Sequence, residues 1–304
     1  MDAIKNVAIV GLGAIGAIYA VKLAQHDPGC LRVIVDETRR ERYRRDGVCL
    51  NEQRYDFTYV TPDEAGEKAD LILVATKSEG LTDAIAAMQP FVHDRTLILS
   101  LMNGISSPAA IAAAYGWDKV LHAFFVGHGS TRVGNAITFD GVGRIVFGDA
   151  DVDGQSSRVE RVAQFFTQAG IAYEVPPDIL FALWSKFVLN VGVNQASAVL
   201  RATYGEFQRN PRALEIAVDL MQEAVALAHI VGIRNADGLL PWSLDFIRNM
   251  PSGFKSSMLQ DIEAGRRTEI DLFAGVICAL GAQHQVDTPY NQLFYRLIRA
   301  LENA

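Results

Sequence analysis

The sequence is poor in cysteine, in long apolar runs and in positive charge, and each shortage argues against a class of protein. Its 304 residues include three cysteines, Cys30, Cys49 and Cys278, which form neither metal-ligand spacing nor a paired framework. We therefore expect reduced thiols, no metal site and a cytoplasmic location. No apolar run reaches the roughly 18 residues of a membrane-spanning helix, and no charged-then-apolar leader precedes the first predicted strand.

The charge balance is acidic. There are 28 basic against 35 acidic residues, for a net charge of −7. Such a surface repels polyanions, so we expect neither nucleic acid nor an anionic membrane as a partner.

The first half of the chain alternates short apolar runs with helical stretches. Buried strands are predicted at "NVAIVG", "RVIVD", "ADLILVATK", "TLILSLMNG" and "KVLHAFFVG". Strands that alternate with helices indicate a parallel sheet covered on both faces. "VCLNEQRYDFTYV" is typical of a hairpin, and the Asp140-Gly141 turn in "NAITFDGVGRIVFGD" predicts a second one.

The second half is almost entirely helical in its periodicity. The change comes after Pro176-Pro177, and the helical pattern runs from Ile179 to Asn303. We expect an α/β domain over 1–178 and an all-α domain of five to seven helices over 179–304.

A glycine motif follows the first predicted strand and opens the first predicted helix. Gly11, Gly13 and Gly16 have G-x-G-x-x-G spacing, and Asp36 stands 20 positions after Gly16 at the end of the next strand. A glycine-rich turn could bind nothing, but strand, helix and acid in this register predict a Rossmann-type dinucleotide site. Its predicted cofactor-binding residues are Gly11, Gly13, Ala14, Ile15, Gly16 and Asp36.

Two further polar residues end predicted strands. Lys77 closes "VATK" and Asn103 precedes Gly104 in "LMNG". Each could be an ordinary surface or turn residue. Ligands of open α/β sheets lie at the carboxyl ends of the strands, so we expect both residues to flank the cofactor.

A polar stripe interrupts an apolar helix in "WSKFVLNVGVNQ". Lys186, Asn190 and Asn194 recur every four residues, which places them on one face of an α-helix. Polar groups cost free energy to bury unless they are partnered. Lys186 could extend to water while the asparagines pair with neighbouring helices, or the stripe could contact a ligand.

Another polar segment is "KSSMLQDIEAGRRTEID". We predict a helix here whose core side carries Met258, Leu259 and Ile262, with its polar residues Ser256, Ser257, Asp261 and Glu269 elsewhere on the helix. Glu263, Arg266 and Arg267 are expected to be a solvated face.

Taken together, these motifs resemble the ketopantoate reductase (2-dehydropantoate 2-reductase) family. The resemblance spans the chain and is carried by "GLGAIG", the lysine of "VATK", "NG" at 103–104, "WSKFVLNVGVN", "SSMLQDIEAGRRTEID" and "TPYN". It implies a Rossmann domain followed by a helical domain like that of 6-phosphogluconate dehydrogenase. The implied activity is NADPH-dependent reduction of ketopantoate to pantoate, on the route to pantothenate and coenzyme A.

The resemblance also implies roles for individual residues. Lys186 matches the catalytic lysine and Glu269 the glutamate that assists it. Asn190, Asn194 and Ser257 match substrate-binding positions, and Asn103 matches the asparagine at the cofactor–substrate junction. A cationic lysine is suited to stabilise and protonate the alkoxide that forms when a 2-keto acid is reduced.

The sequence departs from the family at two places. Ala274-Gly275 stands where Asn-Gly is frequent, and Val35-Asp36 stands where members usually carry Ala-Arg. A carboxylate at position 36 favours NADH over NADPH, unless Arg39 or Arg40 folds back to neutralise the 2′-phosphate.

Two alternatives to this function remain open at this point. The enzyme could reduce another branched 2-keto or 3-hydroxy acid, or the chain could be a catalytically silent NAD(P)H-binding sensor. A homodimer is plausible because helical second domains often associate.

Overall fold

The computed structural model describes residues 3–64, 66–127, 131–141, 143–150 and 156–302. The chain divides into two compact units. Unit 1 comprises residues 1–103 and 107–179, and unit 2 comprises residues 104–106 and 180–304. Each unit is described by itself.

Unit 1 contains an eight-stranded sheet in the order β12-β11-β8-β7-β6-β1-β2-β5. All neighbouring pairs are parallel except β8 with β11. From β1 the chain moves outward through β2 to β5, then crosses to the other side of β1 with β6. Ligands of such sheets bind where this order reverses. The strands are β1 (Val7–Val10), β2 (Leu31–Ile34), β5 (Tyr59–Val60), β6 (Leu71–Val74), β7 (Leu97–Ser100), β8 (Val120–Gly127), β11 (Gly143–Gly148) and β12 (Tyr173–Glu174).

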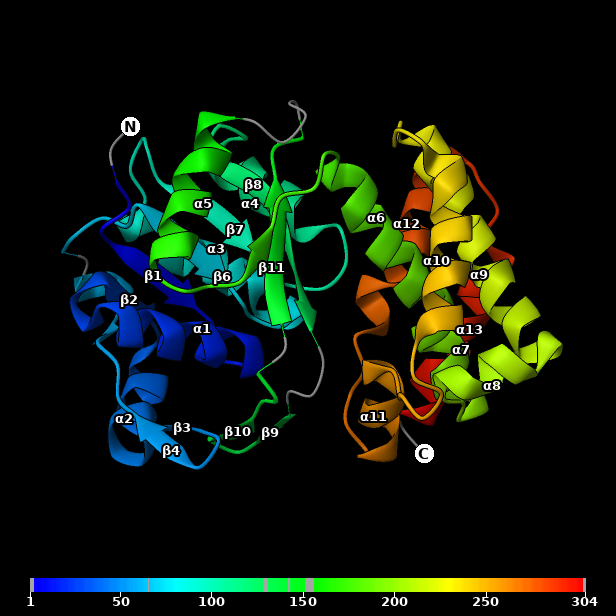
Figure 1. Cartoon of the computed structure of the whole chain (residues 1–304), viewed down its shortest axis with the longest axis horizontal. Coiled ribbons are helices and arrows are strands. Elements are labelled where there is room, and N and C mark those ends of the chain that lie inside the picture. The colour runs from blue at the N-terminus through cyan, green and yellow to red at the C-terminus, as the bar shows by residue number, and fades with distance from the viewer. Residues whose placement is uncertain (1–2, 65, 128–130, 142, 151–155, 303–304) are drawn as a thin grey trace. The chain divides into compact units, whose positions relative to one another are not determined.

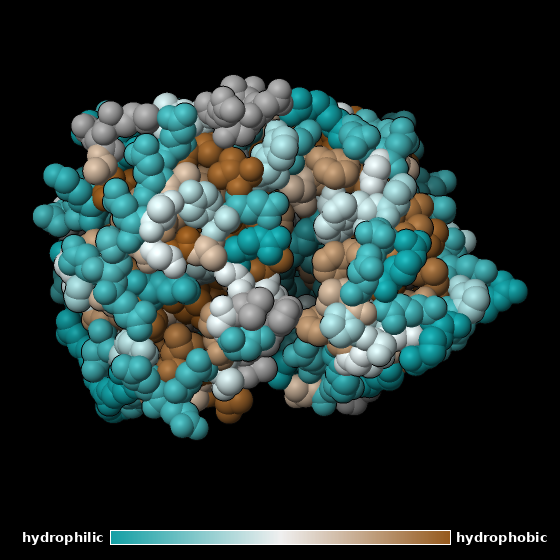
Figure 2. Space-filling model, viewed as in Figure 1, coloured by the Kyte–Doolittle hydropathy of each residue, from teal (hydrophilic) through white to brown (hydrophobic). Residues whose placement is uncertain are grey.

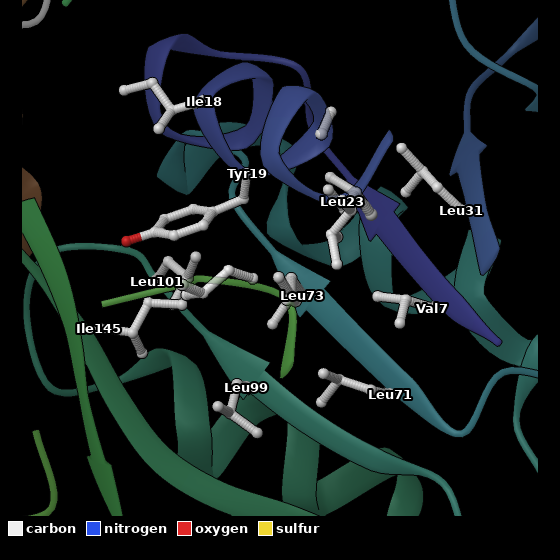
Figure 3. Close-up of a cluster of buried hydrophobic side chains, with 14 of the residues drawn as sticks. Val7, Ile18, Tyr19, Leu23, Leu31, Leu71, Leu73, Leu99, Leu101 and Ile145 are labelled. Atoms are coloured by element: carbon white, nitrogen blue, oxygen red, sulfur yellow. The ribbon is translucent and has the colours of Figure 1, made fainter. Parts of the chain in front are cut away.

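Helices cover both faces of this sheet, because alternate strand residues point to opposite sides. Val7 and Ile9 belong to a core shared with helices α1 (Ala14–His26) and α5 (Ser157–Gln168). Figure 3 shows side chains of α1 directed towards those of the strands. Ala8 and Val10 belong to the opposite core, which includes residues of α3 (Leu81–Met88) and α4 (Ser107–Tyr115). The predicted parallel sheet with two covered faces is confirmed.

A separate four-stranded sheet has the order β4-β3-β10-β9. The hairpin predicted in "VCLNEQRYDFTYV" is present as β3 (Val48–Leu50) and β4 (Gln53–Tyr55), which follow α2 (Glu37–Asp46). The hairpin predicted at Asp140-Gly141 is wrong. β10 (Ala136–Thr138) pairs instead with β9 (Thr131–Val133) and β3, whereas the next run, β11, joins the large sheet beside β8. The two β-rich runs on either side of the turn thus pair with other strands: β10 with the preceding β9 and the distant β3, and β11 with β8.

Unit 2 is helical and has its own apolar core. Its first helical run continues without a break from α6 (Ile179–Leu189), whose first residue belongs to unit 1, through a π-helical segment, Asn190–Asn194, into α7 (Gln195–Leu200). If this run is one helix, the described part of unit 2 falls within the predicted five to seven helices. The remaining helices are α8 (Tyr204–Arg209), α9 (Pro211–Ile230), α10 (Leu239–Asn249), α11 (Ser257–Glu263), α12 (Ala274–His284) and α13 (Pro289–Leu301), as labelled in Figure 1.

The described helices include none that is long and apolar enough to cross a membrane. On the face drawn in Figure 2, hydrophilic residues predominate over apolar ones.

Candidate active site

The glycine-rich loop, residues 11–16, follows β1 at the point where the strand order reverses. Gly11 has a φ of +96°, and a Cβ atom there would lie 2.7 Å from the backbone of Ala75. A Cβ atom at Gly16 would overlap the carbonyl oxygen of Gly11. These two glycines are therefore required by the fold itself.

Gly13 differs from its neighbours. A Cβ atom there would meet only the Ala75 carbonyl oxygen, at an ordinary 3.6 Å. Gly13 is also the N-cap of α1, with no side-chain cap and no acidic residue in the first turn. The loop thus presents a helix N-terminus without a side-chain cap, and its N-cap glycine has room for close approach of another group. This arrangement fits the pyrophosphate of a dinucleotide, which needs close backbone approach and N–H donors such as those at Ala14 and Ile15.

Asp36 lies beyond the end of β2 and caps α2. Its Oδ1 accepts a hydrogen bond from the Arg39 backbone N–H at 2.7 Å, and its Oδ2 lies 2.9 Å from Nη1 of Arg39. Arg40 faces elsewhere: its guanidinium pairs with Glu37 and Glu64, and its side chain is 13% exposed. The two arginines considered from the sequence are therefore not equivalent. Arg39 remains exposed beside Asp36, whereas Arg40 is held by two carboxylates.

Lys77 and Asn103 follow the carboxyl ends of β6 and β7, the next strands on the far side of β1. Lys77 is exposed and Asn103 is half-buried. Gly104, directly after Asn103, belongs to unit 2. It has a φ of +81°, and a Cβ atom there would lie 3.2 Å from the Leu272 carbonyl oxygen. The chain therefore enters unit 2 at Gly104 through a contact that leaves little room for a side chain.

The polar stripe is not carried by a regular α-helix. Lys186 lies in α6, but Asn190 to Asn194 form a π-helical segment, whose wider turn changes the spacing between the two asparagines. The prediction of one regular α-helical face is therefore wrong in its geometry. Lys186 and Asn190 are half-buried, and Asn194 is 4% exposed. Such π segments are rare and occur frequently at functional sites.

Close tertiary packing accompanies the π segment. Gly192 lies against α9, and a Cβ atom there would approach the Ala217 carbonyl oxygen to 2.7 Å. Behind the segment, Nε2 of Gln195 donates to the Val191 carbonyl oxygen at 2.7 Å and to Oδ1 of Asn291 at 2.9 Å. The side chain of Gln195 thus supplies a donor to a carbonyl in the widened turn.

Lys186 is the side chain with unusual electrostatics in this stripe. Burial lowers the pKa of its amine to about 8, while the negative charge of Glu269 acts in the opposite direction. The amine of Lys186 and the carboxylate of Glu269 therefore influence each other, although the two residues are 83 positions apart in the sequence. An amine with this pKa is mostly protonated at neutral pH and can still release its proton readily.

Glu269 does not lie in the helix predicted over 255–271. α11 ends at Glu263, and Glu269 precedes a short 3₁₀ turn, Ile270–Leu272. Gly265, with a φ of +61°, follows the end of α11. At the other end, Ser256 is the N-cap and accepts from the Leu259 N–H at 3.1 Å. Ser257 is the exposed first residue of α11, beside the backbone N–H groups of its first turn.

Two sequence profiles of one family match most of the chain. The profile described as "Ketopantoate reductase PanE/ApbA" matches residues 7–151, and that described as "Ketopantoate reductase PanE/ApbA C terminal" matches residues 178–302. The chain belongs to the ketopantoate reductase family. The expected resemblance and fold class are confirmed.

Individual relatives of the ketopantoate reductase family agree with this assignment. A 2-dehydropantoate 2-reductase of Pyrococcus horikoshii is 29% identical over 81% of this chain and 80% of its own. The fold is shared with a D-mandelate dehydrogenase solved with NADH and anilino(oxo)acetate, with a TM-score of 0.84, 21% identity and 98% of each chain covered. It is also shared with a dimeric ketopantoate reductase of Staphylococcus aureus, with a TM-score of 0.75, 21% identity and coverage of 98% of this chain and 99% of the other.

One cation near the glycine-rich loop could not be identified from the sequence of this family member. The half-buried guanidinium of Arg132, from β9, donates through Nη1 to the carbonyl oxygen of Leu12 and through Nε to that of Gly134 at 2.8 Å. Arg132 and Leu12 are 120 positions apart. No local pattern in the sequence signals that contact.

Proposed function

We propose that this protein is a 2-dehydropantoate 2-reductase, which reduces ketopantoate to pantoate with a nicotinamide cofactor in pantothenate and coenzyme A biosynthesis. The observation that carries the proposal is that, in a member of this family, the charge of Glu269 acts on the Lys186 amine, which lies in the same helical run as Asn190 and Asn194. A cationic amine near amide side chains is the chemistry that a 2-keto acid with a hydroxyl group requires.

The glycine-rich loop, Asp36, Lys77 and Asn103 are the proposed cofactor contacts. When bound, NAD(P)H supplies a hydride to the keto carbon. Lys186 stabilises the negative charge that develops on the keto oxygen and then donates its proton to that oxygen. Glu269 keeps the amine protonated, since its charge raises the pKa of Lys186.

The remaining proposed contacts orient the substrate. Asn190 and Asn194 can donate to and accept from its hydroxyl without adding charge. Ser257, at the start of α11, can bind the carboxylate together with backbone N–H groups of the first turn. We propose that Asn103 lies at the junction between substrate and cofactor. In this proposal, residues 1–178 form the cofactor-binding domain and residues 179–304 form the catalytic domain.

The direct test follows the loss of NAD(P)H absorbance as the cofactor is oxidised in the presence of ketopantoate. The same rate is measured with 2-ketoisovalerate and with phenylglyoxylate. Ketopantoate should give the largest kcat/KM, because only it offers a hydroxyl to the two asparagines. A larger value for either comparison acid would replace ketopantoate as the substrate. Binding of NAD(P)H without turnover of any of the three would indicate a sensor.

The pH dependence of reduction should report the pKa of Lys186. The protonated amine is the active form, so kcat/KM is expected to be level below about pH 8 and to fall above it. An unperturbed lysine would retain its proton to about pH 10. Glu269→Gln should move the alkaline limb to lower pH, because it removes the charge that raises this pKa. A limb near pH 10 in both proteins would contradict the assignment.

We propose NADH as the preferred cofactor, because the Asp36 carboxylate would face the dianionic 2′-phosphate of NADPH. Asp36→Arg should shift the ratio of kcat/KM values towards NADPH. Asp36→Asn is the matched control, since an asparagine still caps α2 but carries no charge, and it should reduce the discrimination without unfolding the helix. A wild-type preference for NADPH that Arg39→Ala removes would show that Arg39 is the selector instead.

We propose that the protein works in the cytoplasm, where its three cysteines stay reduced. We also propose that it forms a homodimer through one face of α13. Tyr290, Leu293 and Leu297 are 46%, 49% and 38% exposed and recur at helical spacing. Leu293→Asp should convert the dimer into a monomer in light scattering with little change in the melting temperature. A wild-type monomer would contradict the proposal.

A further inference from the structure

Glu269 lies between two residues that are held from the last helix of the chain. On its N-terminal side, Thr268 donates to Oε1 of Glu302 through both its backbone N–H, at 2.7 Å, and its hydroxyl, at 2.6 Å. The Thr268 hydroxyl oxygen also accepts from the Ile270 N–H at 3.3 Å. Two hydrogen bonds to one carboxylate oxygen fix the backbone directly before Glu269.

On the C-terminal side of Glu269, Asp271 is held by the same helix. Oδ1 of Asp271 accepts from the Tyr295 hydroxyl at 2.8 Å, and Oδ2 is paired with Nη2 of Arg299. Arg299 also donates through Nη1 to Oε2 of Glu302 at 2.7 Å. Arg299 therefore links Glu302, which holds the residue before Glu269, to Asp271, which stands two positions after it.

The charged side chains of Glu302 and Arg299 are largely shielded from water, whereas that of Asp271 is 43% exposed. The side chain of Glu302 is 7% exposed and that of Arg299 is 24% exposed. Burial acts to raise the pKa of the Glu302 carboxyl, but hydrogen bonds from Thr268 and Arg299 outweigh it and hold that pKa below its usual value. Removing one member of such a pair leaves a shielded charge without its partner, so the arrangement either persists as a whole or is lost.

Glu269 has little else in its own backbone to position it. It follows a run of exposed residues, 263–267, and its φ and ψ of −92° and 33° lie outside regular helix geometry. Its carbonyl oxygen accepts from the Leu272 N–H at 2.9 Å, which closes only a single 3₁₀ turn. The position of its backbone therefore depends on how the adjacent residues are anchored.

We propose that Arg299 and Glu302 are positioning residues for catalysis, which hold Glu269 where its charge acts on Lys186. The proposal rests on the proposed function for its kinetic consequence, but not for its effect on the Lys186 amine. If Arg299 and Glu302 only anchored α13 to residues 268–271, their replacement would change the stability of the protein and leave the titration of Lys186 unaltered.

The test compares wild type with Arg299→Met, Arg299→Lys and Glu302→Gln. Titration of the Lys186 amine is followed by NMR of ¹³C-labelled lysine, with Lys186→Ala to assign the signal. Arg299→Met should move the Lys186 titration to lower pH, in the direction of Glu269→Gln, and Arg299→Lys should restore most of the wild-type value. The matched control is Arg296→Met, an exposed arginine of the same helix, which should leave the titration unchanged.

The kinetic arm measures kcat/KM for ketopantoate in the same proteins. Arg299→Met should lower it about 10-fold, with cofactor Kd unchanged. It should have no further effect in a Glu269→Gln background, because residues that act through one another are not additive. Glu302→Gln serves if Arg299→Met does not fold.

An unaltered Lys186 titration in a folded Arg299→Met or Glu302→Gln protein would overturn the proposal. So would a full additional loss of activity in the Glu269→Gln background. If wild type does not reduce ketopantoate at all, the proposed function fails, while the NMR titration still decides whether Arg299 and Glu302 position Glu269.

Discussion

Replacement of Lys186 by alanine is expected to lower kcat for ketopantoate reduction by at least about 100-fold, the usual scale for loss of a positioned proton donor. The amine is the one group of the polar stripe that can both stabilise and protonate the developing alkoxide. Its pKa, lowered by burial to about 8, matches that task near neutral pH. Steady-state kinetics with saturating cofactor measures the effect.

Cofactor binding should be nearly unchanged in this variant, because the proposed nucleotide contacts belong to unit 1. Lys255→Ala is the matched control. Lys255 is a lysine of the same unit whose amine pairs with Glu263 at the surface, and loss of such a pair has little effect. Wild-type turnover by Lys186→Ala would refute the mechanism and leave Lys186 a structural residue.

Gly13→Ala is expected to weaken binding of NADH and NADPH at least about 10-fold while the protein remains as stable as wild type, because the added methyl group would occupy the space left for the pyrophosphate. Within the fold that methyl group meets only an ordinary contact, at 3.6 Å. Calorimetric titration with each cofactor and a thermal melt measure the two effects separately.

Gly16→Ala provides the contrast. Its methyl group would overlap the Gly11 carbonyl oxygen, so the loop must open and both stability and binding should decrease. If Gly13→Ala binds either cofactor with wild-type affinity, the pyrophosphate does not approach the backbone at this glycine.

Much of unit 1 could be predicted from local patterns. The apolar runs that became β1, β2, β6, β7 and β8 are short and bounded by turn residues, so their strand character depends on neighbours a few positions away. The same holds for the glycine-rich loop. Gly11 and Gly16 are required by a turn and a close contact formed within the strand–turn–helix unit and its adjacent strand.

Strand pairing could not be predicted in the same way. β10 and β11 flank a turn that is typical of a hairpin, yet they belong to different sheets. A turn signal says where the chain reverses, but the partner of a strand is decided by which apolar faces can be buried together.

Unit 2 shows the same limit more sharply. The sequence by itself determined which residue types are proposed to carry the chemistry, because Lys186, Asn190, Asn194 and Glu269 stand in recognisable motifs. Only the tertiary structure decided their geometry. Packing of Gly192 against α9 accompanies the π segment. Glu302 and Arg299 hold Thr268 and Asp271, which are 34 and 28 positions away from them. Helical periodicity describes contacts within about four residues, whereas a widened turn and an anchored loop depend on side chains that only folding brings together.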